Sequence, residues 1–132
     1  MDKPLFIVPQ KAVIIQAGKF LVLKRSLHAA HHAGDWDFPG GKLEYGEGPG
    51  QGLEREVLEE TGLKVKAVRP VFVFAEANKD ENDVFIVWEC KKVSGEVKLS
   101  HEHTEWKWAS KDEALGMGKI EPFLRAYLES LK

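Results

Sequence analysis

The segment REVLEETGL, residues 55–63, places three glutamates on one predicted helix directly after a glycine-rich run, and it constrains the fold more than any other segment. Pro49 suits the first position of that helix, because the N–H that proline lacks would have no partner there. Gly62 suits the left-handed residue that commonly follows a helix. These two residues predict a helix over residues 50–61.

The first turn of this predicted helix is weak. Gly50 and Gly52 each cost about 1 kcal/mol of helix propensity relative to alanine. Leu53 and Val57 are four residues apart and give only a narrow apolar stripe toward a core. Contacts from elsewhere in the chain must therefore hold the first turn.

Segments rich in β-branched and aromatic residues predict strands, over residues 11–16, 20–25, 63–77, 82–93 and 105–110, with a short extended piece at 42–44. Ala17-Gly18-Lys19 suits a tight hairpin between the first two strands. Ser110 and Glu113 have the spacing of a capping box. An amphipathic helix is predicted at the end of the chain, with apolar residues Phe123, Leu124, Tyr127, Leu128 and Leu131.

Length and composition predict one folded domain, over residues 1–132, because 43% of the residues are hydrophobic and 30% are charged. A net charge of −2 excludes the basic field with which proteins bind polymeric nucleic acid. The apolar stretch near the N-terminus is too short for a membrane span. The single cysteine, Cys90, is expected to be a buried, inert thiol, and a reducing cytoplasm is the expected location.

Glu56, Glu59 and Glu60 lie three and four residues apart, so a helix projects them together within about one 5.4 Å turn. Like charges at this spacing repel each other. Mg²⁺ or Mn²⁺ would offset the repulsion, because both ions prefer oxygen ligands and bridge phosphate oxygens. A solvated acidic face is the commoner explanation of a glutamate cluster, and the spacing of the flanking residues decides between the two.

Counted from Gly41, five residues lead to Glu47 and seven more lead to Arg55, where the segment quoted above begins. This pattern resembles the signature of the Nudix hydrolases at every specified position over residues 41–63. A chance match is on the order of one in 10⁹ per starting point. The resemblance implies an α/β/α sandwich with a mixed β-sheet between helices. It also implies metal-assisted attack of water on a nucleoside diphosphate that is linked to another group.

The resemblance implies a role for each residue of the pattern. The metal ligands would be Glu56, Glu59, Glu60 and the backbone carbonyl of Gly40, with Mg²⁺ as the cofactor and Mn²⁺ able to replace it. Glu56 would also act as a base or orient the attacking water. Glu47 and Arg55 would brace the loop against the helix. Gly40 and Gly41 would let the backbone approach metal and phosphates without a Cβ in the way.

Other candidates lie outside the pattern. A further acid is expected in the segment SHEHTEWKW, where Glu102 is preferred over Glu105. Arg25 is a candidate contact for substrate phosphate, although a strand-end arginine is as often a surface charge. Trp36 is equally suited to stacking on a base and to packing in the core. His101 and His103 are candidate phosphate contacts, and exposed loop histidines without function are at least as common.

Within the family, the substrate follows only by elimination. The proline or tyrosine that marks two subgroups about sixteen residues after the pattern is absent, and position 79 is Lys79. The chain therefore looks most like the MutT-type enzymes, which convert a nucleoside triphosphate to a monophosphate and pyrophosphate. Their substrates include oxidised deoxynucleotides. Hydrolysis of ADP-ribose or of dinucleoside polyphosphates, a non-catalytic nucleotide-binding module and a homodimeric assembly remain open.

Overall fold

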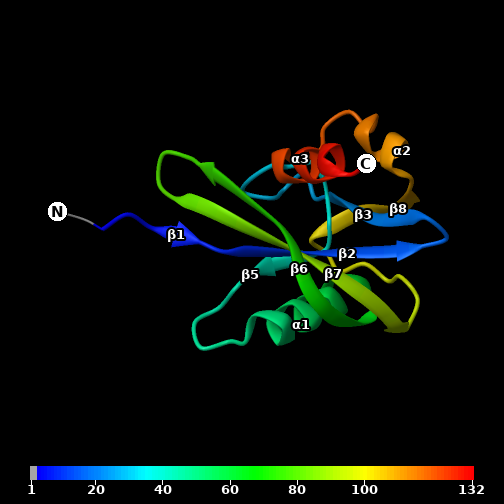
Figure 1. Cartoon of the computed structure of the whole chain (residues 1–132). Helices are drawn as coiled ribbons and strands as arrows, with labels where there is room; N and C mark the ends of the chain where they lie inside the picture. Colours follow the sequence, from blue (N-terminus) through cyan, green and yellow to red (C-terminus); the bar gives the residue numbers. More distant parts are fainter. Residues whose placement is uncertain (1–2) are drawn as a thin grey trace.

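The computed structural model describes residues 3–132 and has three layers (Figure 1). A mixed sheet lies in the middle, with α1 (Pro49–Thr61) on one side and α2 (Lys111–Leu115) and α3 (Pro122–Ser130) on the other. The expected α/β/α sandwich is therefore confirmed. In these residues, no helix is long and apolar enough to cross a membrane.

Over the described residues the sheet has eight strands, β1 (Phe6–Ile7), β2 (Pro9–Gln16), β3 (Lys19–Arg25), β4 (Trp36–Asp37), β5 (Gly40–Lys42), β6 (Lys64–Ala77), β7 (Asn82–Ser94) and β8 (His103–Ala109). Strand β2 is central: it pairs parallel with β7 and antiparallel with β3 and β5. Strands β6 and β7 form the longest hairpin. Because β5 pairs with β2, the glycines after Phe38 are fixed beside the middle of the sheet.

Two apolar clusters hold the layers together. One, beneath α1, includes Leu53 and Val57 of the helix and Ile14 of β2. The other, beneath α3, is built around Phe38 and Phe123, both fully buried. The narrow stripe predicted for α1 is thus the face that packs on the sheet.

The predicted elements differ from the structure mainly at their ends. Strands β1 and β4 were not predicted, because two-residue strands are too short to show periodicity. The extended piece expected at 42–44 lies at residues 40–42 as β5, because Gly40 and Gly41 themselves pair with β2. The capping box is present: Ser110 Oγ accepts from the Glu113 N–H, and Glu113 Oε1 accepts from the Ser110 N–H.

The weak first turn of α1 is held from outside the helix. The amide of Gln10, on β2, donates to the Pro49 carbonyl at 2.7 Å and accepts from the Trp88 indole N–H at 2.9 Å. A Cβ on Gly52 would collide with the Glu47 carboxylate. The glycine therefore gives Glu47 the room to lie against the helix, which places this carboxylate within reach of Arg55.

Candidate functional site

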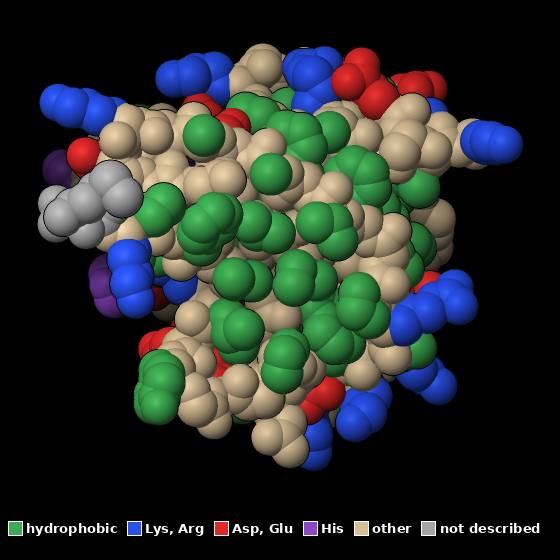
Figure 2. All heavy atoms as spheres, turned by 60° about the vertical axis from the view of Figure 1, so that its left-hand side comes forward, with side chains coloured by type: hydrophobic (Ala, Val, Ile, Leu, Met, Phe, Trp, Pro, Cys, Tyr) green, Lys and Arg blue, Asp and Glu red, His purple; other side chains and the backbone are tan. Residues whose placement is uncertain are grey.

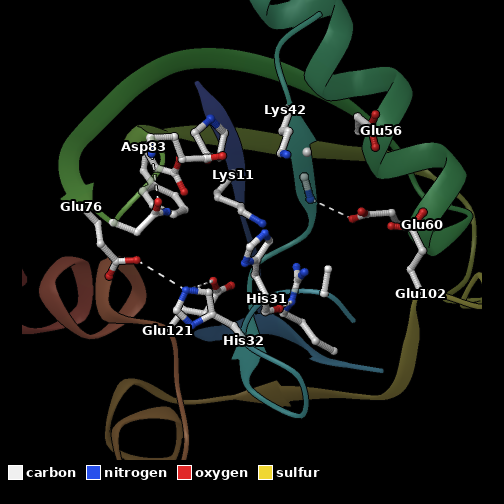
Figure 3. Close-up of a pocket in the computed structure, with 18 of the residues that line it drawn as sticks. Lys11, His31, His32, Lys42, Glu56, Glu60, Glu76, Asp83, Glu102 and Glu121 are labelled. Carbon is white, nitrogen blue, oxygen red and sulfur yellow. Dashed lines mark hydrogen bonds and ion pairs between the residues drawn. The ribbon is translucent and has the colours of Figure 1, made fainter. Parts of the chain in front are cut away.

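A cleft of about 1010 Å³ opens beside α1 and extends to the turn between β6 and β7 (Figure 3). One wall is formed by α1 and β5, and the loop before β4 contributes His31 and His32. Its size suits a ligand as large as a nucleotide. The segments that meet here are far apart in sequence, so only the fold brings them together.

Arg55 organises the outer part of the cleft. Its guanidinium donates to Glu47 Oε2 from Nε at 3.0 Å and from Nη2 at 2.8 Å. Nη1 donates to Glu59 Oε1 at 3.1 Å. These hydrogen bonds hold the pKa of Glu47 below its ordinary value. The bracing pair expected from the sequence is therefore present, and Arg55 also binds one of the expected metal ligands.

Glu60 lies deeper than its neighbours on α1, with only 4% of the residue exposed. Its Oε1 accepts from the Gly40 N–H at 2.9 Å. Burial raises the pKa of Glu60 to about 8. Gly40 has a φ of +144°, and a Cβ there would collide with the Gln10 backbone carbonyl. Position 40 therefore requires glycine, whose N–H donates to Glu60.

Glu56, one helical turn before Glu60, lies against Gly41 in the cleft wall. A Cβ on Gly41 would be 2.8 Å from Glu56 Cδ and Oε2, so glycine leaves room for the carboxylate. Glu56 Oε1 also lies 3.3 Å from Arg55 Nη2. Partial burial raises the pKa of Glu56, and the negative charges of Glu59 and Glu102 add to this effect.

The three glutamates do not converge on one point. Within residues 3–132, no group of three or more His, Cys, Asp or Glu side chains is gathered tightly enough to hold a metal ion. The reason is visible in the contacts: Glu59 is bound to Arg55, and Glu60 is turned to the Gly40 N–H. These residues nevertheless fit Mg²⁺, because all the side-chain ligands would be carboxylate oxygens. The pKa values of Glu56 and Glu60 are raised, and a bound cation would lower both.

Glu102 reaches the same end of the cleft from the loop before β8, and its charge contributes to the raised pKa of both Glu56 and Glu60. A smaller hollow beside it is lined by Arg25, His28, His101 and His103. Glu105, the other acid considered, is on β8 and pairs instead with Lys24 at 3.3 Å. The geometry therefore agrees with the preference for Glu102.

A buried ionic network lies under the cleft floor. Lys11 Nζ donates to Asp37 Oδ2 at 2.8 Å, and Arg25 Nη1 approaches the same oxygen at 3.4 Å. Burial opposes the charge of Lys11, but Asp37 and Glu121 outweigh it and keep the lysine pKa above its ordinary value. Both cations line the cleft, so Arg25 is positioned where a substrate phosphate could reach it.

The position of Trp36 favours one of the two roles left open for it. Trp36 does not line the cleft; it packs against the core around Phe38, so its position does not support stacking on a substrate. His31 and His32, from the loop before β4, also line the cleft. Sequence reasoning also missed Lys11, Asp83 and Glu121, because each comes from a different element and has no motif around it.

The central mixed sheet, the flanking helices and the cleft beside the acidic helix α1 define a Nudix-type hydrolase fold. The family model described as the NUDIX domain matches residues 9–131, and the chain belongs to this family of hydrolases.

Three known proteins illustrate the similarity. A MutT-like protein of Streptomyces ambofaciens is 34% identical over 83% of this chain and 68% of its own length. The CTP pyrophosphohydrolase of Escherichia coli K12 is 32% identical over 79% of this chain and 76% of its own. The crystal structure of a MutT protein from Methanosarcina mazei Go1 superposes with a TM-score of 0.89 at 33% identity, covering 98% of this chain and 94% of that one.

Proposed function

We propose that this protein hydrolyses nucleoside triphosphates to a monophosphate and pyrophosphate, with Mg²⁺ as cofactor and Mn²⁺ as a substitute. The proposal rests mainly on one observation: Glu56, Glu60, Glu102 and Gly41 line the same end of a nucleotide-sized cleft. Similarity to a MutT-like protein and to a CTP pyrophosphohydrolase supports the same reaction class. A single domain over residues 1–132 and a cytoplasmic location are proposed with it.

The proposal gives each residue of the site a role. Glu56, Glu59, Glu60 and the Gly40 carbonyl would hold the metal, which neutralises phosphate charge and lowers the pKa of water when it is bound. Glu56 or Glu102 would then take the proton of the attacking water. Glu47 holds Arg55, and Arg55 holds the position of Glu59. Arg25 and Lys11 offer positive charge to the phosphate chain, and Gly41 leaves the approach open.

The test is an assay of the purified protein against a panel of nucleotides with Mg²⁺. Glu56→Gln should lower the rate by about 10²–10⁴-fold, because it removes a metal ligand and proton acceptor. Glu54→Gln is the matched control on the same helix: Glu54 accepts from the Ala67 N–H at 2.8 Å and does not line the cleft, so its rate should not change. Product analysis in ¹⁸O-labelled water would identify the attacked phosphorus.

Other outcomes of this assay point to other functions. If the protein hydrolyses only ADP-ribose, or only dinucleoside polyphosphates, it has the substrate of another branch of the family. Complete inactivity of both the wild type and Glu56→Gln on every nucleotide would favour a module that binds nucleotides without cleaving them.

A homodimer is proposed as the assembly. Figure 2 shows a face on which hydrophobic side chains gather. On β6, which pairs only with β7 among the strands described, Val68 is 50% exposed, Val71 39% and Val73 62%. Light scattering after gel filtration should give twice the monomer mass, and Val73→Lys should return the protein to a monomer. A wild-type monomer at high concentration would exclude the dimer.

A further inference from the structure

The smaller hollow beside Glu102 has a volume of about 310 Å³ and opens at the α1 end of the cleft. Arg25, Ala30 and Glu102 line both the hollow and the cleft, so the two spaces meet at these residues. Figure 3 shows Glu102 on the same side of the cleft as Glu56 and Glu60. A ligand that extends past these glutamates can therefore enter the hollow.

Two short loops form the walls of the hollow, one after β3 and one before β8. The Ser26 N–H donates to the Glu102 carbonyl at 3.0 Å and joins the two loops. Within each loop a serine hydroxyl accepts from a backbone N–H: Ser26 Oγ from His28 at 3.1 Å, and Ser100 Oγ from Glu102 at 3.3 Å. His28 on one loop and His101 on the other thus line the same space.

The side chains around the hollow offer hydrogen-bond donors. Arg25 donates from Nε to the His31 carbonyl at 3.1 Å and from Nη1 to Asp37 Oδ2 at 3.4 Å. Its Nη2 has no hydrogen-bond partner among the described residues. His28 and His101 are exposed, and an imidazole donates through at least one N–H in either protonation state. A ligand in the hollow thus meets donors from three side chains.

Two other residues of the hollow limit what it can hold. His103 is only 6% exposed, and burial lowers its pKa, so it adds little positive charge at neutral pH. Glu102 carries negative charge to the boundary with the cleft. This charge repels an anion until a divalent ion binds at the α1 end. An anionic ligand would therefore occupy the hollow together with the metal.

Size and chemistry together define the ligand. A volume of about 310 Å³ is at the lower end of the range of small-molecule sites, about 300–1,000 Å³. It suits one or two phosphate groups and not a second nucleoside. Guanidinium and imidazole N–H groups match phosphate oxygens. We propose that Arg25, His28 and His101 bind the terminal phosphate of a nucleoside triphosphate, so that the protein selects triphosphates over nucleoside diphosphates and diphosphate sugars.

This inference rests on the proposed function, because it assumes that the metal lies at the α1 carboxylates. It is tested with analogues in which a methylene group replaces the oxygen between the first and second phosphates and prevents cleavage there. The α,β-methylene triphosphate and diphosphate of one nucleoside differ only in the terminal phosphate. In calorimetric titrations with Mg²⁺, using the adenosine, guanosine, cytidine and uridine pairs, the triphosphate should bind the wild type about 10-fold or more tightly.

Variants locate the selection. His28→Ala combined with His101→Ala should lower this affinity ratio about 5-fold or more and leave the affinity for the diphosphate nearly unchanged. Both side chains are exposed, so the double variant should fold, and circular dichroism checks this. The corresponding double glutamine variant should restore part of the ratio, because an amide also donates. Lys91→Ala removes an exposed cation that lines neither space and is the control.

Because the analogues bind without being cleaved, the two proposals can fail separately. A preference for the triphosphate that depends on His28 and His101, with no turnover of natural nucleotides, would overturn only the proposed function. Turnover of triphosphates with equal binding of both analogues would overturn the inference. A preference that the double alanine variant keeps, an equal loss of affinity for both analogues in that variant, or no binding of any analogue would also overturn it.

Discussion

Arg55 determines how the acidic side chains of the cleft are arranged. It holds Glu47 through two hydrogen bonds and Glu59 through Nη1, while the side chain of Glu59 is 58% exposed. An exposed pair of this kind contributes little to stability, so a metal ion can draw Glu59 away from Arg55 at little cost. The Glu47 pair, with two bonds to one carboxylate, is the part expected to persist when metal binds.

Cys90 gives a prediction at the scale of one residue. It is 7% exposed, and burial raises the pKa of its thiol to about 12. Because only the thiolate reacts with thiol reagents, the native protein should show almost no labelling over minutes at pH 8. The same protein in denaturant should label fully. Rapid labelling of the native protein would show that the strand around Cys90 opens readily.

At the scale of elements, the two glycines in the first turn of α1 differ in what a side chain there would contact. A Cβ at Gly50 would meet Ala67 Cβ at 3.6 Å and the Trp88 ring at 3.8 Å, which are ordinary contacts. At Gly52 a Cβ would displace the Glu47 carboxylate. One glycine is therefore replaceable, and the other is required for the Glu47–Arg55 pair.

This difference predicts opposite results for two equal substitutions. Gly50→Ala should stabilise the protein by about 0.5–1 kcal/mol and leave hydrolysis unchanged. Gly52→Ala should lower the rate of hydrolysis, because Glu47 can no longer hold Arg55 in place. Urea unfolding and a nucleotide assay measure both effects. Equal activity of the two variants would show that the position of Glu47 does not matter.

The capping box of α2 predicts a pH dependence of stability. Hydrogen bonds from the Ser110 backbone and from Lys107 lower the pKa of Glu113 to about 2. Because the folded pKa lies below the ordinary value of 4.5, this stabilisation is present above about pH 4.5 and is lost as the pH falls toward 2. Glu113→Gln removes the titrating group and should flatten this acid limb in urea unfolding, whereas Ser110→Ala keeps the backbone donor and should leave most of the limb in place. An unchanged acid limb would contradict the assignment.

Sequence reasoning predicted long elements better than short ones. Strands β6 and β7 and helix α1 were predicted within one or two residues, because their apolar patterns extend over many positions. Strands β1 and β4 depend on partners that are distant in sequence and were missed. The bracing of α1 by Gln10 and Trp88 could not be predicted, since nothing near these residues indicates that they meet.

At the scale of the whole molecule, the residues at one end of the cleft could be predicted from the sequence, and those at the other end could not. The α1 end lies within or beside one continuous pattern, so the resemblance to the Nudix signature implied roles for Glu56, Glu60 and the adjacent Gly40. The opposite end combines β6, β7 and the start of α3, and its residues become neighbours only when the sheet forms. Convergence of all three helix glutamates was expected and is not seen, because Arg55 competes for Glu59.

The central claim is that carboxylates of α1 bind a divalent ion, and direct titration with Mn²⁺ tests it. Manganese at about 100 times its Kd should stabilise the wild type by about 2.7 kcal/mol, observed as a rise in Tm. Glu56→Gln and Glu60→Gln should lose most of this rise and most of the Mn²⁺ binding seen by electron paramagnetic resonance, while Glu54→Gln retains both. Equal Mn²⁺ binding by all four proteins, or none by the wild type, would contradict the account.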